Sequence, residues 1–149
     1  MFEKFGEFDS YGEINMAAEG LFNEGDLDGL RALAKENGIE PDITDPYIQG
    51  EIPALCDAMM AAAGELIIER ADKAVNEYNK KIPADPIVEY LMARTEKSEL
   101  AEAIRRKEKS LAGCLAHIEK EARKIVSRER PWLNDAAVYK MARDYYLGR

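Results

Sequence analysis

The stretch ALCDAMMAAAGELIIERADKAVNEYNKK, residues 54–81, decides the expected fold. Apolar residues recur in it three and four positions apart, which is the spacing of an α-helix. They form two adjacent stripes, one of Leu55, Met59, Ala62 and Leu66 and the other of Met60, Ala63, Ile67, Ala71, Ala74 and Tyr78. Apolar cover of this width predicts a long central helix that is contacted on two sides. The small residues at 61–64 allow a neighbouring backbone to approach closely.

Helical signals continue toward the N-terminus. Ser10 and Glu13 fit a capping box, in which the hydroxyl accepts from a free N–H and the glutamate reaches back. The helix that follows is expected to carry one apolar face, made of Ile14, Ala17, Ala18, Leu21 and Phe22.

Further caps divide the rest of the chain into helices. Asp26 or Asp28 is expected to cap a second short helix, which the Asn37-Gly38 pair ends. Asp45-Pro46 and Asp85-Pro86 are expected to open two more helices, because proline is tolerated in the first turn. Later helices are predicted at about 86–95, 98–107, 110–128 and 135–147.

No segment alternates apolar and polar residues over the length of a strand. We therefore predict an all-α fold, a compact multi-helix bundle around the long central helix. The chain of 149 residues is expected to form one helical domain, residues 1–149. Its first fifty residues are able to form a small acidic helical subdomain, although nothing in the sequence marks a boundary.

Charge is distributed unevenly along the chain, whose formal net charge is −8. Residues 1–50 hold twelve Asp and Glu against three Lys and Arg, whereas residues 101–149 hold seven against twelve. Such asymmetry suggests charge-directed association with a partner. The alternative is that the two ends attract each other within one fold and the remaining charge is solvated surface.

The candidate acidic contacts lie in the N-terminal third, at Glu24, Asp26, Asp28, Asp42 and Asp45. The first three alternate before Gly29, which resembles the start of a calcium-binding loop. The position that needs a bidentate glutamate is Lys35, so the calcium-loop pattern fails. These acids are better interpreted as helix caps and as a negative exterior.

The C-terminal third contains a basic segment. In the predicted helix 110–128, Leu111, Leu115, Ile118, Ala122 and Ile125 mark the core face, and Gly113, His117, Lys120, Lys124 and Arg128 lie opposite. Four basic residues lie between positions 105 and 109, just before this helix, and they cannot all point inward. The candidate basic contacts are therefore Arg105, Arg106, Lys107, Lys109, Lys120 and Lys124.

Signals for chemistry are weak. Cys114 and His117 have a spacing that suits two metal ligands, but zinc needs two more, so we expect no metal site and no cofactor. A single histidine with no orienting partner does not indicate a nucleophile, and no phosphate-binding glycine motif occurs. We do not expect an enzyme. In the closing segment, Val138, Met141, Ala142 and Tyr145 recur at helical spacing. This spacing favours a helix docked on the core over an aromatic surface that stacks on nucleic-acid bases.

The expected location is the cytoplasm. The first residues, MFEKFGEFD, lack the apolar region of a signal peptide, and no run approaches the length of a membrane span. Two cysteines without a CxxC motif suit a reducing compartment.

Four segments of the sequence resemble PcfK-like proteins: FEKFGEFDSYGEINMAAE, GDLDGLRALAKENGI, IRRKEKSLAGCLAHIEKEARKIV and VYKMARDYYLG. They resemble more narrowly the branch described as inhibitors of the type II CRISPR nuclease, the anti-CRISPR proteins. The resemblance implies a protein of a mobile genetic element that binds the type II CRISPR effector nuclease, with or without its guide RNA. An acidic surface would then compete with nucleic acid or block a conformational step of the nuclease.

Two other functions are compatible with the sequence. A conjugation accessory protein, which the family resemblance also allows, would bind DNA or partner proteins through the basic segment, including Arg123. Direct DNA binding is disfavoured by the negative net charge. The other alternative is a helical scaffold that only self-associates. The sequence does not decide whether the protein forms homo-oligomers. The basic segment is expected to contact RNA, a protein or the acidic half of the chain itself.

Overall fold

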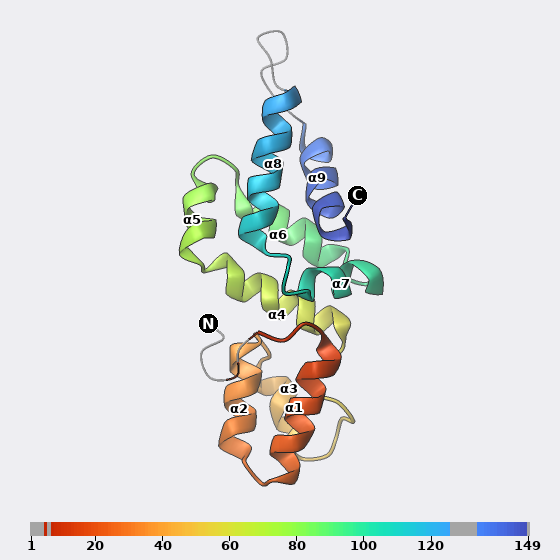
Figure 1. The fold of residues 1–149 in the computed structure, drawn as a ribbon. Helices are drawn as coiled ribbons and strands as arrows, with labels where there is room; N and C mark the ends of the chain where they lie inside the picture. The colour runs from red at the N-terminus through yellow and green to blue at the C-terminus, as the bar shows by residue number, and fades with distance from the viewer. Residues whose placement is uncertain (1–4, 6, 126–133, 149) are drawn as a thin grey trace.

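A computed structural model describes residue 5 and residues 7–125 and 134–148, with the side chain of Ser98 left out. The described chain contains nine helices and no strand, which confirms the all-α prediction (Figure 1). The helices are α1 (Tyr11–Asn23), α2 (Leu27–Glu36), α3 (Pro41–Ile48), α4 (Ala58–Arg70), α5 (Lys73–Asn79), α6 (Ala84–Ala93), α7 (Ser98–Arg105), α8 (Leu111–Ile125) and α9 (Asp135–Leu147).

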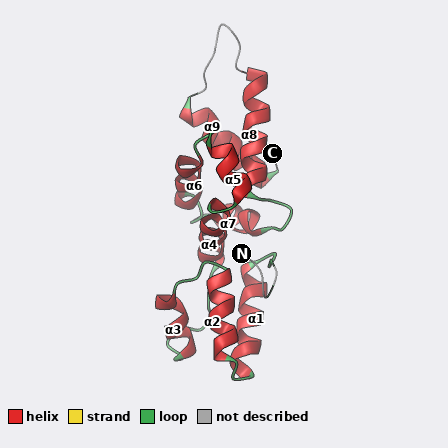
Figure 2. Cartoon of the chain, turned by 90° about the vertical axis from the view of Figure 1, so that its left-hand side faces the viewer, coloured by secondary structure: helices red, strands yellow, loops and turns green. Residues whose placement is uncertain are grey.

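The helices form two groups at opposite ends of an elongated molecule. Helices α1, α2 and α3 make one end, α5 to α9 make the other, and α4 crosses between them (Figure 1). The view turned by a quarter shows α3 beside α2, in agreement with their contacts (Figure 2). We call the two groups the N-terminal lobe and the C-terminal lobe.

Each lobe has its own hydrophobic core. The N-terminal core consists of Ile14, Ala18, Leu33, Ala34, Ile39, Leu55, Cys56 and Ala61. The larger C-terminal core includes residues from α4 to α9, among them Leu66, Ile87, Leu91, Ile104, Leu115 and Tyr146. The N-terminal core thus extends beyond residues 1–50, because Leu55, Cys56 and Ala61 belong to it.

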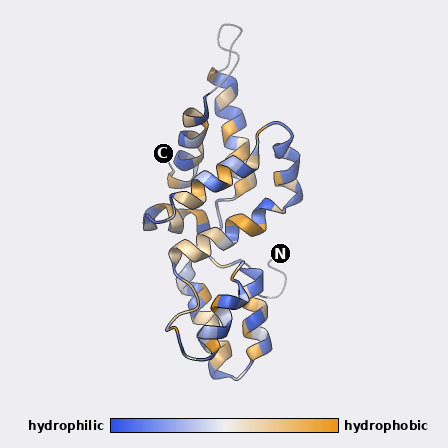
Figure 3. Ribbon diagram, turned by 180° about the vertical axis from the view of Figure 1, so that it is seen from behind, coloured by the Kyte–Doolittle hydropathy of each residue, from blue (hydrophilic) through white to orange (hydrophobic). Residues whose placement is uncertain are grey.

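Helix α4 belongs to both cores and is central in position. Its Ala61 packs in the N-terminal core, while Ala62 and Leu66 pack in the C-terminal core, and Figure 3 shows its hydrophobic part between the lobes. The two-sided contact expected from the stripes is thus present. Met59 and Ile67, both placed on these stripes, are nevertheless 45% and 54% exposed.

The expected continuous helix over the opening stretch is wrong. Helix α4 begins at Ala58, where Asp57 accepts a hydrogen bond from the Met60 N–H at 2.8 Å. It ends at Arg70, and α5 starts after Asp72, whose backbone is extended. Aspartate is a favoured residue before a helix, and the break lets α5 turn to contact α6 and α8. The central helix is therefore two helices.

A pair of glycines brings the end of α2 against α4. Gly38 has φ of +71°, and a Cβ atom placed on it would lie 2.6 Å from the Gly64 Cα. A Cβ atom on Gly64 would overlap the carbonyl oxygen of Asn37. The close approach expected of residues 61–64 is therefore a backbone-to-backbone contact at Gly64.

The expected caps are mostly correct. Ser10 accepts a hydrogen bond from the Glu13 N–H at 3.2 Å, and the Glu13 carboxylate accepts one from the N–H of Asp9 at 2.6 Å. Asp26 caps α2 by accepting from the Gly29 N–H at 2.8 Å.

The two proline starts are displaced. Helix α3 begins at Pro41, so Pro46 lies inside it, and the expected start at Asp45-Pro46 is wrong. Helix α6 begins at Ala84, two residues before Pro86. Pro41 and Pro86 lie in the first turns of α3 and α6, where a missing N–H would be unpaired in any case, whereas Pro46 lies in the second turn of α3.

The C-terminal helices follow the predicted faces. Leu111, Leu115 and Ile118 are buried, whereas Ile125 at the end of α8 is 42% exposed. In α9, Ala142 and Tyr146 are buried, and Val138, Met141 and Tyr145 pack against the C-terminal core. The docked closing helix is therefore confirmed. The predicted helix end at 126–128, with Arg128, lies outside the described residues.

Among the described helices, none combines the length and the apolar character needed to cross a membrane.

Candidate interaction surfaces

Three of the five candidate acidic residues share one turn at the far end of the N-terminal lobe. Glu24 follows α1, Asp26 caps α2 and Asp28 lies in the first turn of α2, and all three are exposed. The turn between α1 and α2 forms the lower end of the molecule in Figure 1. We call Glu24, Asp26 and Asp28 the acidic tip. Acidic groups in a first helical turn are also favoured by the helix dipole.

The other two acidic candidates lie on α3. Asp42 is exposed in the first turn of α3. Asp45 accepts a hydrogen bond from Arg31 of α2, in an ion pair whose side chains are both about half exposed. An ion pair of this kind neutralises part of the acidic surface, so Asp45 contributes less negative charge than the acidic tip.

Apolar side chains lie beside the acidic tip. Phe22, which the sequence assigned to the buried face of α1, is 41% exposed, and Leu27 at the start of α2 is 39% exposed. The Phe22 ring lies 6.0 Å from the ring of Tyr47 on α3. Both rings line a groove of about 500 Å³ between α1, the end of α3 and residues 50–55. The acidic tip thus adjoins exposed aromatic surface.

The basic segment does not lie on one surface, because Arg105 points inward. Its side chain is 1% exposed. It donates hydrogen bonds to the carbonyl oxygens of Phe8 at 3.2 Å and Ala61 at 3.3 Å, and another to the Asn37 side chain. Its Nε atom lies 3.7 Å from Glu65 Oε2. Arg105 is therefore unable to act as an exposed partner contact, and the expectation for this residue is corrected.

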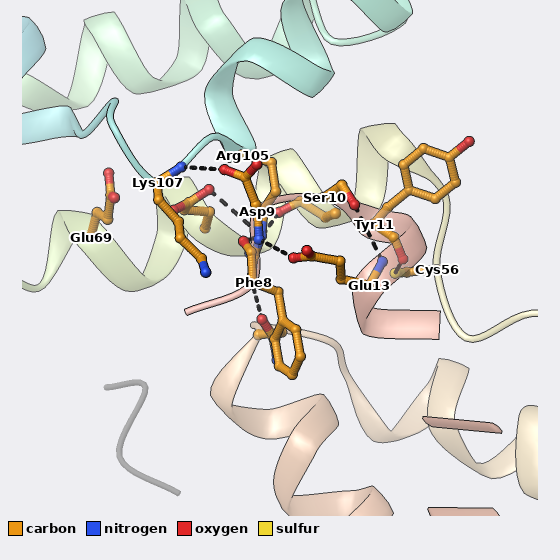
Figure 4. Close-up of polar contacts among 12 residues, drawn as sticks. Phe8, Asp9, Ser10, Tyr11, Glu13, Cys56, Glu69, Arg105 and Lys107 are labelled. Carbon is orange, nitrogen blue, oxygen red and sulfur yellow. Dashed lines mark hydrogen bonds and ion pairs between the residues drawn. The ribbon is translucent and has the colours of Figure 1, made fainter. Parts of the chain in front are cut away.

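These contacts join the two lobes. Arg105 ends α7 in the C-terminal lobe, whereas Phe8 lies just before α1 of the N-terminal lobe (Figure 4). Asn37 follows α2 of the same lobe. The neighbouring N–H of Lys107 donates to the Asp9 carboxylate at 2.8 Å. One open alternative for the basic segment was contact with the acidic half of the chain. Arg105 makes such contacts through Phe8 and Asn37, and the backbone N–H of Lys107 makes one through Asp9.

Three carboxylates surround the buried arginine. Glu7, Glu65 and Glu69 each offer an oxygen within 4.8 Å of the others, and these are the described residues with a geometry that could hold a metal ion. Glu69 accepts a hydrogen bond from the Leu111 N–H at 2.7 Å. Neither oxygen of Glu65 has a hydrogen-bond donor among the described residues.

One guanidinium cannot balance the two buried carboxylates, Glu65 and Glu69, with the half-buried Glu7 beside them, so protons are favoured on the buried pair. Burial, followed by the adjacent Glu7 carboxyl group, raises the pKa of Glu65 from 4.5 to about 10 even though Arg105 opposes the change. Burial also raises the pKa of Glu69 to about 7, although its bond from Leu111 lowers it. Near neutral pH, Glu65 therefore holds a proton and Glu69 is close to half-ionised.

The remaining basic candidates are accessible to different degrees. Arg106, Lys107, Lys120 and Lys124 are exposed, and Lys109 is half-buried with its ammonium group 4.8 Å from the centre of the Tyr145 ring. On α8, Lys124 pairs with Glu121 at 3.1 Å and Arg123 with Glu119 at 2.6 Å. Part of the basic stripe is therefore neutralised by carboxylates of its own helix.

Cys114 and His117 are close in sequence but lie in different environments. Cys114 is fully buried, and burial raises the pKa of its thiol to about 12. His117 is half-buried, and its ring centre lies 5.7 Å from that of Tyr145. The second cysteine, Cys56, is a free thiol in the N-terminal core. The thiols thus occupy different cores.

Comparison with models of protein families gives no match for the chain, and neither the curated proteins nor the solved structures give one. The resemblance to PcfK-like proteins therefore stays a hypothesis based on the four sequence segments.

Proposed function

We propose that this protein inhibits an RNA-guided type II CRISPR nuclease by direct binding through the acidic tip. The observation that carries the proposal is the placement of Glu24, Asp26 and Asp28 on one exposed turn at the end of the molecule. The resemblance to anti-CRISPR proteins supplies the identity of the partner.

The partner's surface suits such a contact. A type II nuclease holds its RNA–DNA heteroduplex in a positively charged channel and uses arginines to read the short motif beside its target. A narrow acidic end is able to enter such a surface, and complementary charge accelerates encounter and selects the partner. Phe22 and Leu27 add exposed apolar area next to the tip, and aromatic residues are enriched at the centre of protein interfaces.

The buried arginine supports the acidic tip over the basic segment as the contact. With Arg105 inside the protein and Arg123 and Lys124 paired on α8, fewer cations are available to phosphates than the sequence suggests. Nonspecific DNA affinity depends on the number of phosphates neutralised. A conjugation accessory that binds DNA through this segment is therefore the weaker alternative.

The test is charge reversal of the acidic tip. The variant Glu24→Lys, Asp26→Lys and Asp28→Lys should lose inhibition of target cleavage by guide-loaded nuclease. All three residues are exposed, so we expect the helical content to be kept, with a loss of about 1 kcal/mol in stability from the Asp26 cap. Circular dichroism and a melting curve on the same sample separate a binding defect from unfolding.

The matched control neutralises the exposed Arg106 and Lys107 and the half-buried Lys109 with glutamine and leaves Arg105 intact. We expect this variant to keep most of its inhibition. Equal inhibition by wild-type protein and the acidic-tip variant would refute the contact that we propose. Raised salt should also slow association, because charge steering is screened over about 8 Å at physiological ionic strength.

A further inference from the structure

A pocket in the C-terminal lobe gathers cations from two segments of the chain, the loop between α6 and α7 and helix α9. It has a volume of about 300 Å³ and lies between the end of α6, the start of α7 and the end of α9, and α9 contacts both of the other helices. Arg94, Lys97 and Arg143 line it, together with Tyr90, Glu99, Leu100 and Leu147. With three cations against one carboxylate, the lining is positive in a protein whose net charge is −8.

Two of these cations have no carboxylate partner within the described part of the chain. Arg94 and Lys97 are exposed, and neither forms an ion pair there. The Arg143 Nε atom lies 3.5 Å from Asp144 Oδ1, but Asp144 also accepts a hydrogen bond from Lys140 at 2.8 Å. Arg143 thus shares a carboxylate that is already paired, and it forms no other ion pair with the described residues.

The aromatic residue of the pocket is occupied on both faces. One face of Tyr90 stacks on Tyr139, with ring centres 4.6 Å apart and planes 6° from parallel. The Arg94 guanidinium lies 4.9 Å from the centre of the Tyr90 ring. These contacts hold Arg94 in place, and they leave no open ring face on which a nucleobase could stack.

We propose that this pocket binds a phosphate group, either in a small phosphorylated compound or in the backbone of a nucleic acid. Arginine presents a planar set of donors that matches phosphate oxygens bidentately, and lysine adds a point charge. Two arginines and one lysine, from the α6–α7 loop and from α9, surround a volume that accommodates one or two phosphate groups. Because Tyr90 offers no stacking face, recognition depends on the anion and carries no base preference. This proposal is independent of the acidic tip, which lies in the other lobe.

The test is titration calorimetry of the full chain with sodium pyrophosphate, and separately with a single-stranded oligonucleotide of mixed sequence. The variant Arg94→Gln with Lys97→Gln should weaken binding at least tenfold, because each removes a charge-assisted contact. Arg143→Gln alone should weaken it in the same direction. Both altered residues of the double variant are exposed, and a melting curve checks that the fold is kept.

The matched control removes two exposed cations elsewhere, through Arg106→Gln with Lys120→Gln, and should bind like wild type. Binding of both ligands would assign the pocket to a phosphate backbone, whereas binding of pyrophosphate alone would assign it to a small phosphorylated compound. Absence of binding by wild-type protein would overturn the proposal. Equal loss in the control would overturn it too, since the effect would then report net charge and no defined site.

Discussion

Arg105 is predicted to hold the two lobes together, and replacing it tests this role. The perturbation is Arg105→Met, which keeps much of the side-chain length and removes every donor. In the structure the Arg105 side chain is 1% exposed. Its guanidinium donates hydrogen bonds to the carbonyl oxygens of Phe8 and Ala61 and to the side chain of Asn37, and its Nε atom lies 3.7 Å from Glu65 Oε2. The substitution therefore leaves a buried amide oxygen and two carbonyl oxygens without this donor.

The size of the effect follows from these contacts. Breaking a buried ion pair by removing one partner costs about 3–5 kcal/mol, and an unsatisfied buried polar group costs about 1–3 kcal/mol. Glu65 is able to hold a proton, which limits the penalty from its own charge. We therefore expect a loss of about 3–4 kcal/mol, near the lower end of that range for a buried pair. For a chain of this size that lowers the melting temperature by roughly 10 °C.

The assay is urea unfolding followed by circular dichroism, with Arg106→Met as the matched control. Arg106 is the exposed neighbour, so its replacement should change the free energy of unfolding by less than about 0.5 kcal/mol. In the double variant Arg105→Met with Glu65→Gln, the total loss should be smaller than the sum of the single losses, because the two side chains interact. Equal stability of the Arg105 and Arg106 variants would refute the role assigned to Arg105.

Two further predictions concern stability. Folding raises the pKa values of Glu65 and Glu69 to about 10 and about 7. Their contribution to the free energy of unfolding is therefore complete below the ordinary pKa of 4.5, and it is lost as the pH rises through the folded values. Unfolding free energy should therefore fall between pH 5 and pH 7, by up to about 1.4 kcal/mol per pH unit for each group, and Glu65→Gln with Glu69→Gln should flatten this dependence. A wild-type stability that rises over this range would contradict the prediction. Gly64→Ala should destabilise the protein by about 1–3 kcal/mol, because the added Cβ atom meets the Asn37 carbonyl. The control Gly20→Ala, on the exposed surface of α1, should not destabilise it. Equal melting temperatures of the two variants would contradict the contact between Gly64 and the end of α2.

Caps and apolar spacing were enough to predict most of the fold. Ser10 and Asp26 cap the helices that the sequence assigned to them, because a capping side chain acts on N–H groups only two or three residues away. The closing helix 135–147 was predicted with its observed bounds. Local signals of this kind are readable because they depend on near neighbours.

Breaks within a helix were harder to predict. Apolar spacing continues across Ala71 and Asp72, yet α4 ends there and α5 turns toward α6 and α8. The preference for this turn comes from tertiary contacts, which local periodicity does not encode. Aspartate at position 72 was the one local signal that could have indicated the break.

The direction of the basic side chains could not be predicted for a similar reason. Arg105 is the last residue of the short helix α7, in which Leu100, Ala101 and Ile104 are also buried. Its own burial depends on Glu65, Asn37 and Phe8 from distant parts of the chain. The sequence did contain a signal, since Glu65 and Glu69 stand four apart within the most apolar stretch. Buried carboxylates there require a cation or a proton. By contrast, the acidic tip was predictable, because helix caps at a turn are exposed in most folds.

The central claim is that the acidic tip binds a guide-loaded type II CRISPR nuclease, and the most direct measurement is a pull-down of that nuclease by immobilised protein at physiological salt. We predict that the wild-type protein retains the nuclease, that the Glu24→Lys, Asp26→Lys and Asp28→Lys variant releases it, and that neither protein shifts bare DNA in a parallel gel assay. A wild-type protein that shifts bare DNA at the same salt and does not retain the nuclease would contradict the account and favour the DNA-binding alternative.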